Sequence, residues 1–322
     1  MSLSNKDDIQ VSVCVVTYNQ ENYIAECLES LVTQQTSFKF EIIVGEDCST
    51  DGTRAIVQHY VEQYPNLVIP LFHESNVGAV ENVKRVYKAA RGKYIAHMDG
   101  DDMALPNKLQ RQFDTLEANP DCSICVHNMN AVDGKSQIME RAFPLFEEKK
   151  YSLIDMYLIN PFFIHSSKMF INKIDEYIEQ LNVNALDTEV HIEQAKQGGI
   201  YFLSDNLGVY RQFVGVTFEQ GFMSSLVRER MISVYENINT QYFNSDEIIK
   251  INKKYARMLL EYAYQCAVSV RDQSIFKEYV NKSWDTEKLG IVSVFFKLGS
   301  LKPNLFFYLC NLRAKVRSKG IN

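Results

Sequence analysis

The sequence lacks several features that would assign it to large classes of protein. No apolar run approaches the roughly 20 residues that a membrane-spanning helix needs, so we expect no transmembrane segment. Residues 1–8 are polar and lack the apolar core of a signal peptide. Basic residues are not in excess, because 34 Lys and Arg stand against 40 Asp and Glu and give a net charge of −6. This balance argues against a nucleic-acid partner, and together these features predict a cytoplasmic protein.

Cysteine and glycine patterns exclude further kinds of site. The seven cysteines are scattered and odd in number. Cys122 and Cys125 form one Cys-x-x-Cys without a second pair, which is a weak zinc signal, and we interpret them as small apolar residues of a strand in a reducing compartment. No predicted turn carries Gly-x-Gly-x-x-Gly or Gly-x-x-x-x-Gly-Lys, so neither a Rossmann dinucleotide site nor a P-loop is supported.

The first hundred residues alternate between apolar β-branched runs and amphipathic patterns of helical period. Strands are predicted over four segments, at 11–17, 41–46, 67–72 and 93–98. Asn19 is a candidate cap for the helix that follows the first strand. The alternation with short connections predicts a parallel sheet with helices on both faces. Ligands of such sheets bind at the carboxyl ends of the strands, where Tyr18, Asp47 and Asp99 all fall.

The pattern becomes less regular after residue 105 and changes character near 220. We predict a helix from Pro106 to about Glu117, a strand over 123–129, and a helix beginning at Asp187. Weaker patterns predict helices over 151–158 and 172–181, an extended segment over 161–170, and short strands over 200–203 and 207–210. Residues 225–286 carry long helical patterns without glycine. The sequence therefore predicts an α/β domain over 1–220 and a helical region over 221–322.

The turn Asp99-Gly100-Asp101-Asp102 places three carboxylates in four residues, directly after a predicted buried strand. Carboxylates so close repel one another, and a hard divalent cation such as Mg²⁺ or Mn²⁺ relieves that repulsion. Mg²⁺ typically takes one or two protein carboxylates and completes its shell with phosphate and water, so this turn could hold a metal–diphosphate. The alternative is a solvated acidic turn that caps the next helix.

A series of motifs resembles family 2 glycosyltransferases with the GT-A fold. It covers roughly residues 9–215 and consists of the segments 16–19, 47–53, 76–78, 92–95, 99–102, 106–109, 165–170 and 210–211. The resemblance implies a Rossmann-like, mixed and mainly parallel sheet flanked by helices. It is closest to bacterial members that build O-antigen, capsule or other surface polysaccharide.

The resemblance also implies roles for residues of the donor side. Thr17 and Tyr18 would contact the uracil of a UDP-sugar, with Asn19 in the same donor-binding group, and Asp47 would accept a hydrogen bond from the base. Asp99 would lie near the ribose and the donor. The metal, Mn²⁺ or Mg²⁺, would be bound by Asp101, and Arg211 would approach the diphosphate.

On the acceptor side, Asp187 falls where the family has its catalytic base. The position departs from the usual Glu-Asp pair, since Leu186 precedes Asp187, so Glu189 remains an alternative base. Asp187 could also serve as a helix N-cap. A histidine often follows Tyr-Arg by two residues, and here Gln212-Phe213 stand instead, which leaves a histidine metal ligand unsupported.

The function implied is an inverting transfer of a hexosyl or N-acetylhexosaminyl group from a nucleotide sugar to a glycan or lipid-linked acceptor. Two alternatives are a sugar-nucleotide-binding protein without catalysis and a nucleotidyltransferase. The second is disfavoured because its glycine-rich basic loop is absent from the N-terminal region.

The C-terminal region carries two aromatic-rich patches, 291–296 and 305–309. A basic cluster follows them, made of Arg313, Lys315, Arg317 and Lys319. Aromatic surface beside basic residues suits a peripheral contact with an anionic membrane, at its inner face. The alternative is that the aromatic side chains complete the helical core.

Overall fold

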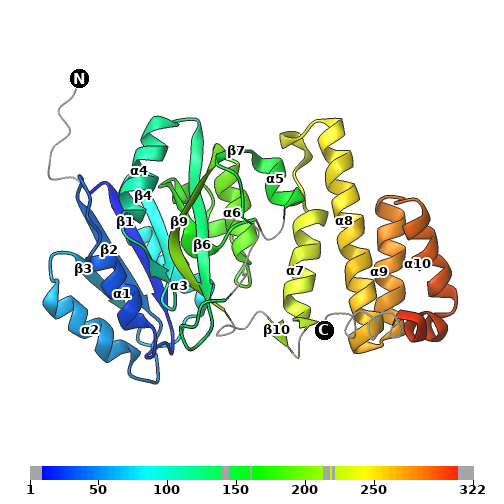
Figure 1. Cartoon of the computed structure of the whole chain (residues 1–322), viewed down its shortest axis with the longest axis horizontal. Helices are drawn as coiled ribbons and strands as arrows, with labels where there is room; N and C mark the ends of the chain where they lie inside the picture. Colours follow the sequence, from blue (N-terminus) through cyan, green and yellow to red (C-terminus); the bar gives the residue numbers. More distant parts are fainter. Residues whose placement is uncertain (1–8, 140–144, 160–161, 213–217, 220–221, 311–322) are drawn as a thin grey trace. The chain divides into compact units, whose positions relative to one another are not determined.

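The computed structural model describes residues 9–139, 145–159, 162–212, 218–219 and 222–310. The chain divides into two compact units, 1–215 and 216–322, with the division close to the one predicted after residue 220. In Figure 1 the strands and flanking helices of the first unit run from blue to green, and the helices of the second from yellow to red.

The first unit is built on a nine-stranded sheet, which is mixed, as the resemblance implies. Its strand order is β3-β2-β1-β4-β8-β6-β9-β5, with β7 also paired to β9. The strands β3, β2, β1 and β4 are parallel to one another, and so are β6 and β9. The short strand β8 is antiparallel to both β4 and β6 and joins these two sets.

The predicted strand–helix alternation is present in the first half of the unit. Its elements are β1 (Val11–Thr17), α1 (Ile24–Val32), β2 (Phe40–Glu46), α2 (Thr53–Gln63), β3 (Val68–Phe72), α3 (Ala79–Ala89) and β4 (Tyr94–Asp99). They are followed by β5 (Met103–Ala104), α4 (Lys108–Ala118), β6 (Cys122–Val132), β7 (Lys149–Tyr151) and α5 (Leu153–Leu158).

Successive residues of each strand point to opposite faces of the sheet, and both faces are covered by packed side chains. Val11, Val13 and Val15 pack with apolar side chains of α1, α2 and α4 on one face. Cys14 points to the other face, where its Sγ lies 3.6 Å from the carbonyl oxygen of Val86 on α3. A Cβ on Gly45 of β2 would lie only 2.3 Å from the Val86 side chain, so glycine lets α3 approach the sheet closely. Helices therefore cover both faces.

Three predictions for the later part of this unit need correction. The extended segment predicted over 161–170 is interrupted in its described part, 162–170, because η1 (His165–Ser167) is a 3₁₀ turn that precedes β8 (Met169–Ile171). Residues 172–181 form no α-helix but two 3₁₀ turns, η2 (Ile174–Glu176) and η3 (Ile178–Gln180). The two short strands predicted over 200–210 are one strand, β9 (Gly199–Arg211), whose pairing with β6 is irregular. The helix α6 (Asp187–Ala195) begins where it was predicted.

The second unit is mainly helical, as predicted. It contains a small hairpin of β10 (Phe218–Glu219) and β11 (Phe222–Met223), and the helices α7 (Ser225–Glu236), α8 (Ser245–Gln265), α9 (Gln273–Thr286) and α10 (Ile291–Leu301). Tyrosines contribute to its core, as the stacked and buried rings of Tyr235 and Tyr255 show. In the described parts of both units, no helix is long and apolar enough to cross a membrane.

Candidate active site

The loops that follow β1 and β2 are joined by hydrogen bonds at the carboxyl edge of the sheet. Asn19 adopts a left-handed conformation with φ of 53°. Its Oδ1 accepts a hydrogen bond from the backbone of Thr50 at 2.8 Å, and its own backbone N–H donates to Ser49 at 3.0 Å. Asn19 is therefore not the cap of α1, which begins at Ile24 after Tyr23. It links two of the loops that the motifs assign to the donor.

Thr17 and Gly100 bring the ends of β1 and β4 into close contact. Thr17 is 3% exposed and donates from its Oγ1 to Gln20 at 2.8 Å. A Cβ on Gly100 would lie 2.9 Å from the Cβ of Thr17, so only glycine fits in the acidic turn at this point. Tyr18, the next residue after Thr17, is 44% exposed and is available to a ligand.

Asp47 holds a third loop in place. It is 2% exposed, and its two carboxylate oxygens accept hydrogen bonds from the backbone N–H groups of Val77 at 2.7 Å and Gly78 at 3.0 Å. These contacts fix the turn before α3, in which Gly78 has a φ of 87°. The contact between Asp47 and a uracil stays a prediction, and it would use the lone pairs that the two amides leave over.

The acidic turn is bonded to β4, η1 and β9. Asp99 accepts hydrogen bonds from His97 Nε2 at 3.1 Å and from Ser166 Oγ at 3.2 Å, and its side chain is 36% exposed. Asp102 is buried, and its Oδ1 accepts a hydrogen bond from the backbone N–H of Arg211 at 2.9 Å. The other oxygen of Asp102 is buried and has no hydrogen-bond partner among the described residues. The turn thus joins both halves of the sheet.

Electrostatic repulsion between these carboxyl groups changes their ionisation. Burial, followed by the charge of Asp99, raises the pKa of Asp101 to about 6. Burial and the charges of Asp99 and Asp101 likewise raise the pKa of Asp102 well above its ordinary value. Burial alone would raise the pKa of Asp99, but its contact with His97 lowers it instead.

These carboxylates suit a hard cation that brings its own phosphate ligands. Within the part of the chain that the structure describes, no group of three or more His, Cys, Asp or Glu side chains forms a ready-made metal site. Mg²⁺ bound with a diphosphate needs only one or two protein carboxylates, and carboxylate oxygen is its preferred donor. The raised pKa of Asp101 and the unpartnered oxygen of Asp102 both indicate a turn that lacks a counter-charge, so the residues fit the ion.

Arg211, expected to approach the diphosphate, is buried beside the acidic turn. It is 2% exposed, and its guanidinium donates to Glu26 at 2.7 Å and to Ser136 Oγ at 2.8 Å. Its Nε donates to the carbonyl oxygen of Asp101 at 3.1 Å, and the group lies 4.5 Å from the ring centre of Tyr23. The guanidinium thus holds the acidic turn against α1 and the loop after β6, and a contact between Arg211 and a diphosphate stays a prediction.

Asp187 is the first residue of α6 and does not cap that helix. Its Oδ1 lies 2.7 Å from Nδ1 of His165, and its side chain is 67% exposed. Crowding by protein atoms would raise the pKa of Asp187, but the charge and hydrogen bond of His165 outweigh this effect and keep it well below its ordinary value. Glu189, the alternative base, accepts a hydrogen bond from the backbone N–H of Leu186 at 2.9 Å and so helps to start the helix.

Two further residues of this site escape a prediction from sequence. The hydroxyl of Tyr87, on α3, lies 3.3 Å from Nε2 of His165 and 2.9 Å from Nδ1 of His97. The two imidazole rings are 3.7 Å apart between centroids. Tyr87 reads in the sequence as an ordinary apolar contact of an amphipathic helix, and His97 as one residue of a buried strand. In the sequence, only the motif 165–170, which begins with His165, points to this part of the site.

Other buried ionisable groups lie around these histidines. His191 is 3% exposed, not solvent-facing, and its Nε2 is among the few buried polar atoms of the described residues without a hydrogen-bond partner. Lys168 is fully buried and donates to Gln194 at 3.2 Å, and burial lowers its pKa to about 7. Cys122 and Cys125 are free and buried in β6, as expected.

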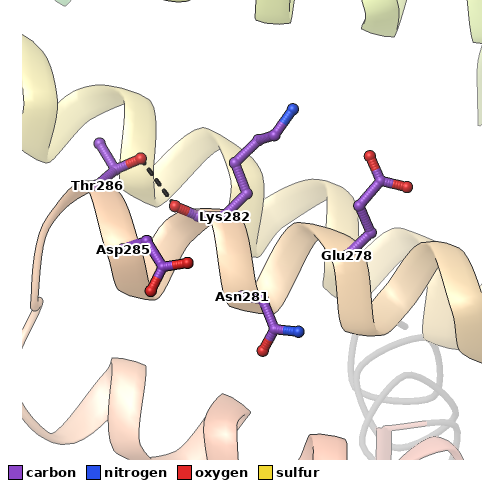
Figure 2. A pocket seen from close by; sticks show the side chains of 5 residues that line it. All are labelled: Glu278, Asn281, Lys282, Asp285 and Thr286. Atoms are coloured by element: carbon purple, nitrogen blue, oxygen red, sulfur yellow. Dashed lines mark hydrogen bonds between the residues drawn. The ribbon is translucent and has the colours of Figure 1, made fainter.

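A hollow in the second unit is not a candidate site. Figure 2 shows that Glu278, Asn281, Lys282, Asp285 and Thr286, all on α9, line it. Two of these side chains already have partners on other helices: Lys282 pairs with Glu236 at 2.9 Å, and Asn281 accepts a hydrogen bond from Lys297 at 2.6 Å. None of the motif residues contributes to this hollow.

Comparisons with known proteins agree with the motifs. A family model described as glycosyl transferase family 2 matches residues 12–178. The uncharacterized protein Rv1520 of Mycobacterium tuberculosis is 32% identical over 206 residues, which are 63% of this chain and 58% of that protein. TuaG of Bacillus subtilis, named as a teichuronic acid biosynthesis glycosyltransferase, is 34% identical over 125 residues, which are 38% of this chain and 49% of TuaG. The matches thus span about half to three fifths of these relatives.

A solved structure has the same fold. Residues 1–349 of TarS from S. aureus, in complex with UDP-GlcNAc, superpose with a TM-score of 0.62 at 20% sequence identity. The match covers 86% of this chain and 81% of that one. The predicted GT-A fold with a helical C-terminal region is therefore confirmed.

The burial of Arg211 leads to a prediction about stability. Arg211→Lys should lower the free energy of unfolding by about 2–3 kcal/mol, because lysine cannot replace the hydrogen bonds to Glu26, Ser136 and Asp101 together. Urea denaturation measures this, and Arg85→Lys, at an exposed pair with Glu81, should change it by less than about 0.5 kcal/mol. If Arg211 instead binds the diphosphate, UDP affinity would fall while stability stayed close to that of the parent.

Proposed function

Since the chain belongs to glycosyl transferase family 2, we propose that it transfers a sugar from a UDP-sugar to a hydroxyl group of an acceptor and inverts the anomeric configuration. The observation that supports this most directly is an exposed, ionised carboxylate at Asp187 in the same unit as the acidic turn Asp99–Asp102. A single base and one in-line displacement give inversion, because the acceptor oxygen attacks the face opposite the leaving group.

Asp101 would hold the Mn²⁺ or Mg²⁺, with Asp99 near the ribose. When bound, the metal would neutralise charge on the leaving diphosphate as a Lewis acid. The chain's own contribution on this side is to fix the loops. Asn19, Asp47 and Gly100 hold the turns together, and the exposed Tyr18 and the adjacent Thr17 would contact the uracil.

Asp187 would take the proton of the acceptor hydroxyl. A general base must be ionised and within hydrogen-bond reach of the proton that it removes. The low pKa of Asp187 satisfies the first condition, and its exposure leaves room for the second. Glu189 is the weaker candidate because its carboxylate is bonded to the start of its own helix.

The sugar and the acceptor follow from the comparisons as proposals. TarS binds UDP-GlcNAc and TuaG is named for teichuronic acid biosynthesis, so we infer an N-acetylhexosaminyl or hexosyl donor and a glycan or lipid-linked acceptor of a bacterial surface polysaccharide, such as an O-antigen or capsule. Membership of the family leaves no support for the nucleotidyltransferase, whereas a binding protein without catalysis would have to lack a working Asp187.

The second unit offers a surface for a peripheral contact with an anionic membrane at its cytoplasmic face. Among the residues of α10 only Ser293 and Ser300 are buried, and its apolar side chains are exposed except for Phe296, which is half-buried against Phe306. The exposed set in α10 and the helical residues 303–310 comprises Ile291, Val292, Val294, Phe295, Leu298, Leu301, Leu305, Tyr308 and Leu309.

The small residues of α10, such as Ser293, Gly299 and Ser300, lie on the side of the helix that packs against its neighbours. A Cβ on Gly299 would lie 2.2 Å from the ring of Phe306, so this ring rests directly on the helix backbone. The exposed Lys302 follows the exposed apolar residues of α10 in the chain, which suits anionic lipid. The basic cluster Arg313, Lys315, Arg317 and Lys319 lies outside the described residues.

The metal assignment predicts the behaviour of Asp101→Ala. This variant should lose the gain in UDP affinity that Mn²⁺ provides, because the carboxylate that would bind the ion is absent. Calorimetric titration of UDP with and without Mn²⁺ measures it, with Asp114→Ala on the exposed face of α4 as a control of equal chemistry. An unchanged metal-dependent affinity in Asp101→Ala would refute the assignment.

The base assignment predicts that Asp187→Asn keeps its affinity for UDP but loses on the order of 10²–10⁴-fold in turnover. The amide has nearly the shape of the carboxylate but cannot accept the acceptor's proton. Release of UDP from UDP-GlcNAc in the presence of Mn²⁺ gives the rate, with water or a glycan as the acceptor. Normal turnover in Asp187→Asn combined with loss in Glu189→Gln would move the base to Glu189.

The membrane proposal predicts that the double variant Leu298→Glu, Leu301→Glu sediments at least about tenfold less with vesicles containing phosphatidylglycerol, because each apolar group withdrawn from lipid weakens binding. The double variant Ile249→Glu, Val270→Glu adds the same charge at exposed positions elsewhere in the second unit. Equal sedimentation of the two variants would contradict the proposal.

A further inference from the structure

Four hydrogen-bond contacts connect the acceptor-side carboxylate with the donor-side carboxylate through the interior of the first unit. The chain of groups, from one end to the other, is Asp187, His165, Tyr87, His97 and Asp99. Its links measure 2.7, 3.3, 2.9 and 3.1 Å in that order. Only the two end groups are exposed to any extent, since Tyr87 and His97 are fully buried and His165 is 7% exposed.

The number of protons on each group determines which group donates and which accepts in each of these hydrogen bonds. A carboxylate only accepts, so His165 donates from Nδ1 to Asp187, and His97 donates from Nε2 to Asp99. Burial lowers the pKa of His97 to about 3, so its ring is neutral and its Nδ1 can only accept. Tyr87 therefore donates to Nδ1 of His97, which is the shorter of its two contacts.

Tyr87 has one hydroxyl proton for two imidazole rings. With both carboxylates ionised and both rings neutral, four contacts share three protons, and the contact left without one is that between Tyr87 and Nε2 of His165, the longest of the four at 3.3 Å. A proton added to His165 would complete all four bonds. The arrangement therefore favours the state of His165 in which Nδ1 carries a proton and donates it to the carboxylate of Asp187.

We propose that His165 is a positioning residue, which Tyr87 and His97 hold in place and which orients Asp187 for its role as the base. This inference rests on the proposed function, because it assumes that Asp187 accepts the proton of the acceptor. His165 occupies Oδ1 of Asp187, and Oδ2 has no hydrogen-bond partner among the described residues. Oδ2 is thus the oxygen left for the acceptor hydroxyl.

In the transfer step the acceptor O–H bond breaks and its proton goes to Oδ2 of Asp187. The acceptor oxygen forms the new bond to the anomeric carbon, and the bond from that carbon to the diphosphate breaks with its electron pair leaving on UDP. His165 does not touch the reacting atoms. It keeps the carboxylate ionised before the step and fixes its rotation, while the link through Tyr87 and His97 sets its position relative to the donor side.

The proposal predicts a change in pH dependence. Removal of the His165 imidazole takes away the main interaction that lowers the pKa of Asp187, so that pKa rises. The carboxylate is the active form, hence the acidic limb of the rate profile should move to higher pH. The other charged or titratable groups around Asp187 are Lys168, His97, Tyr87, Asp99 and Tyr210, and all are retained in the variant.

The test compares His165→Leu, His165→Asn and Tyr87→Phe with Asp187→Asn. The rate is UDP release from UDP-GlcNAc with Mn²⁺, and calorimetry gives the UDP affinity. His165→Leu should lose at least about tenfold in kcat, within the range that a general base contributes, while its UDP affinity stays within about twofold. His165→Asn should recover part of the loss, since its amide nitrogen replaces Nδ1. Tyr87→Phe should fall between the parent and His165→Leu.

A matched control tests whether any buried imidazole near the site matters. His191→Leu removes a ring whose centroid is 5.1 Å from that of His165 and whose Nε2 has no partner, so it should keep the parent's kcat and pH profile. Thermal melting shows whether each variant is folded. If Asp187→Asn is inactive and His165→Leu keeps both kcat and the pH profile, the positioning role is wrong. If Asp187→Asn is itself active, the proposed base is wrong instead.

A spectroscopic measurement tests whether this series of hydrogen bonds exists, and it does not depend on catalytic turnover. Long-range ¹H–¹⁵N spectra of the six histidines in the ¹⁵N-histidine-labelled protein report which ring nitrogens carry protons. His165 should show a protonated Nδ1, and its signals should shift in both Asp187→Asn and Tyr87→Phe, whereas His191→Leu should leave Nδ1 protonated. Signals of His165 that are unchanged in Asp187→Asn and Tyr87→Phe would overturn the inference.

Discussion

Repulsion among the three carboxyl groups of the acidic turn is the constraint on which the rest of the first unit depends. Such a cluster is stable only where other groups hold each member separately. His97 and Ser166 donate hydrogen bonds to Asp99, and the backbone of β9 donates to Asp102. The guanidinium of Arg211 donates to the carbonyl oxygen of Asp101. These partners come from β4, η1 and β9, so the charge cluster also fixes the relative positions of the sheet's two parallel halves.

The sequence predicts the first half of this unit well because its signals are local. Each strand from β1 to β4 is rich in apolar residues, and β1, β2 and β3 are each followed by a helix with an apolar face. The motifs also predict that Asp99, Asp101 and Asp187 belong to one site, and contacts through His165, Tyr87 and His97 connect Asp187 with Asp99.

Prediction fails where distant parts of the chain decide the outcome. Residues 172–181 have helical spacing but form two 3₁₀ turns, and β8 is only three residues long, too short for a sequence pattern to reveal. The partners of Arg211 could not be predicted either, because Glu26, Ser136 and Asp101 reach it from three other segments of the chain. Tyr87 and His97 acquire their role only because η1 brings His165 against them.

The short strand β8 has a consequence for the order of folding. It is the link between β4 and β6 in the sheet, and it follows β4 by some seventy residues in the chain. During synthesis from the N-terminus, β1 to β4 can pair with one another as soon as they emerge, because all four strands lie within the first 100 residues. Until residues 169–171 arrive, β4 is an open edge with unpaired backbone groups, which is a site where nascent chains associate. The half built on β1 to β4 thus matures first, and its exposed edge persists until the half that contains β6, β8 and β9 has been made.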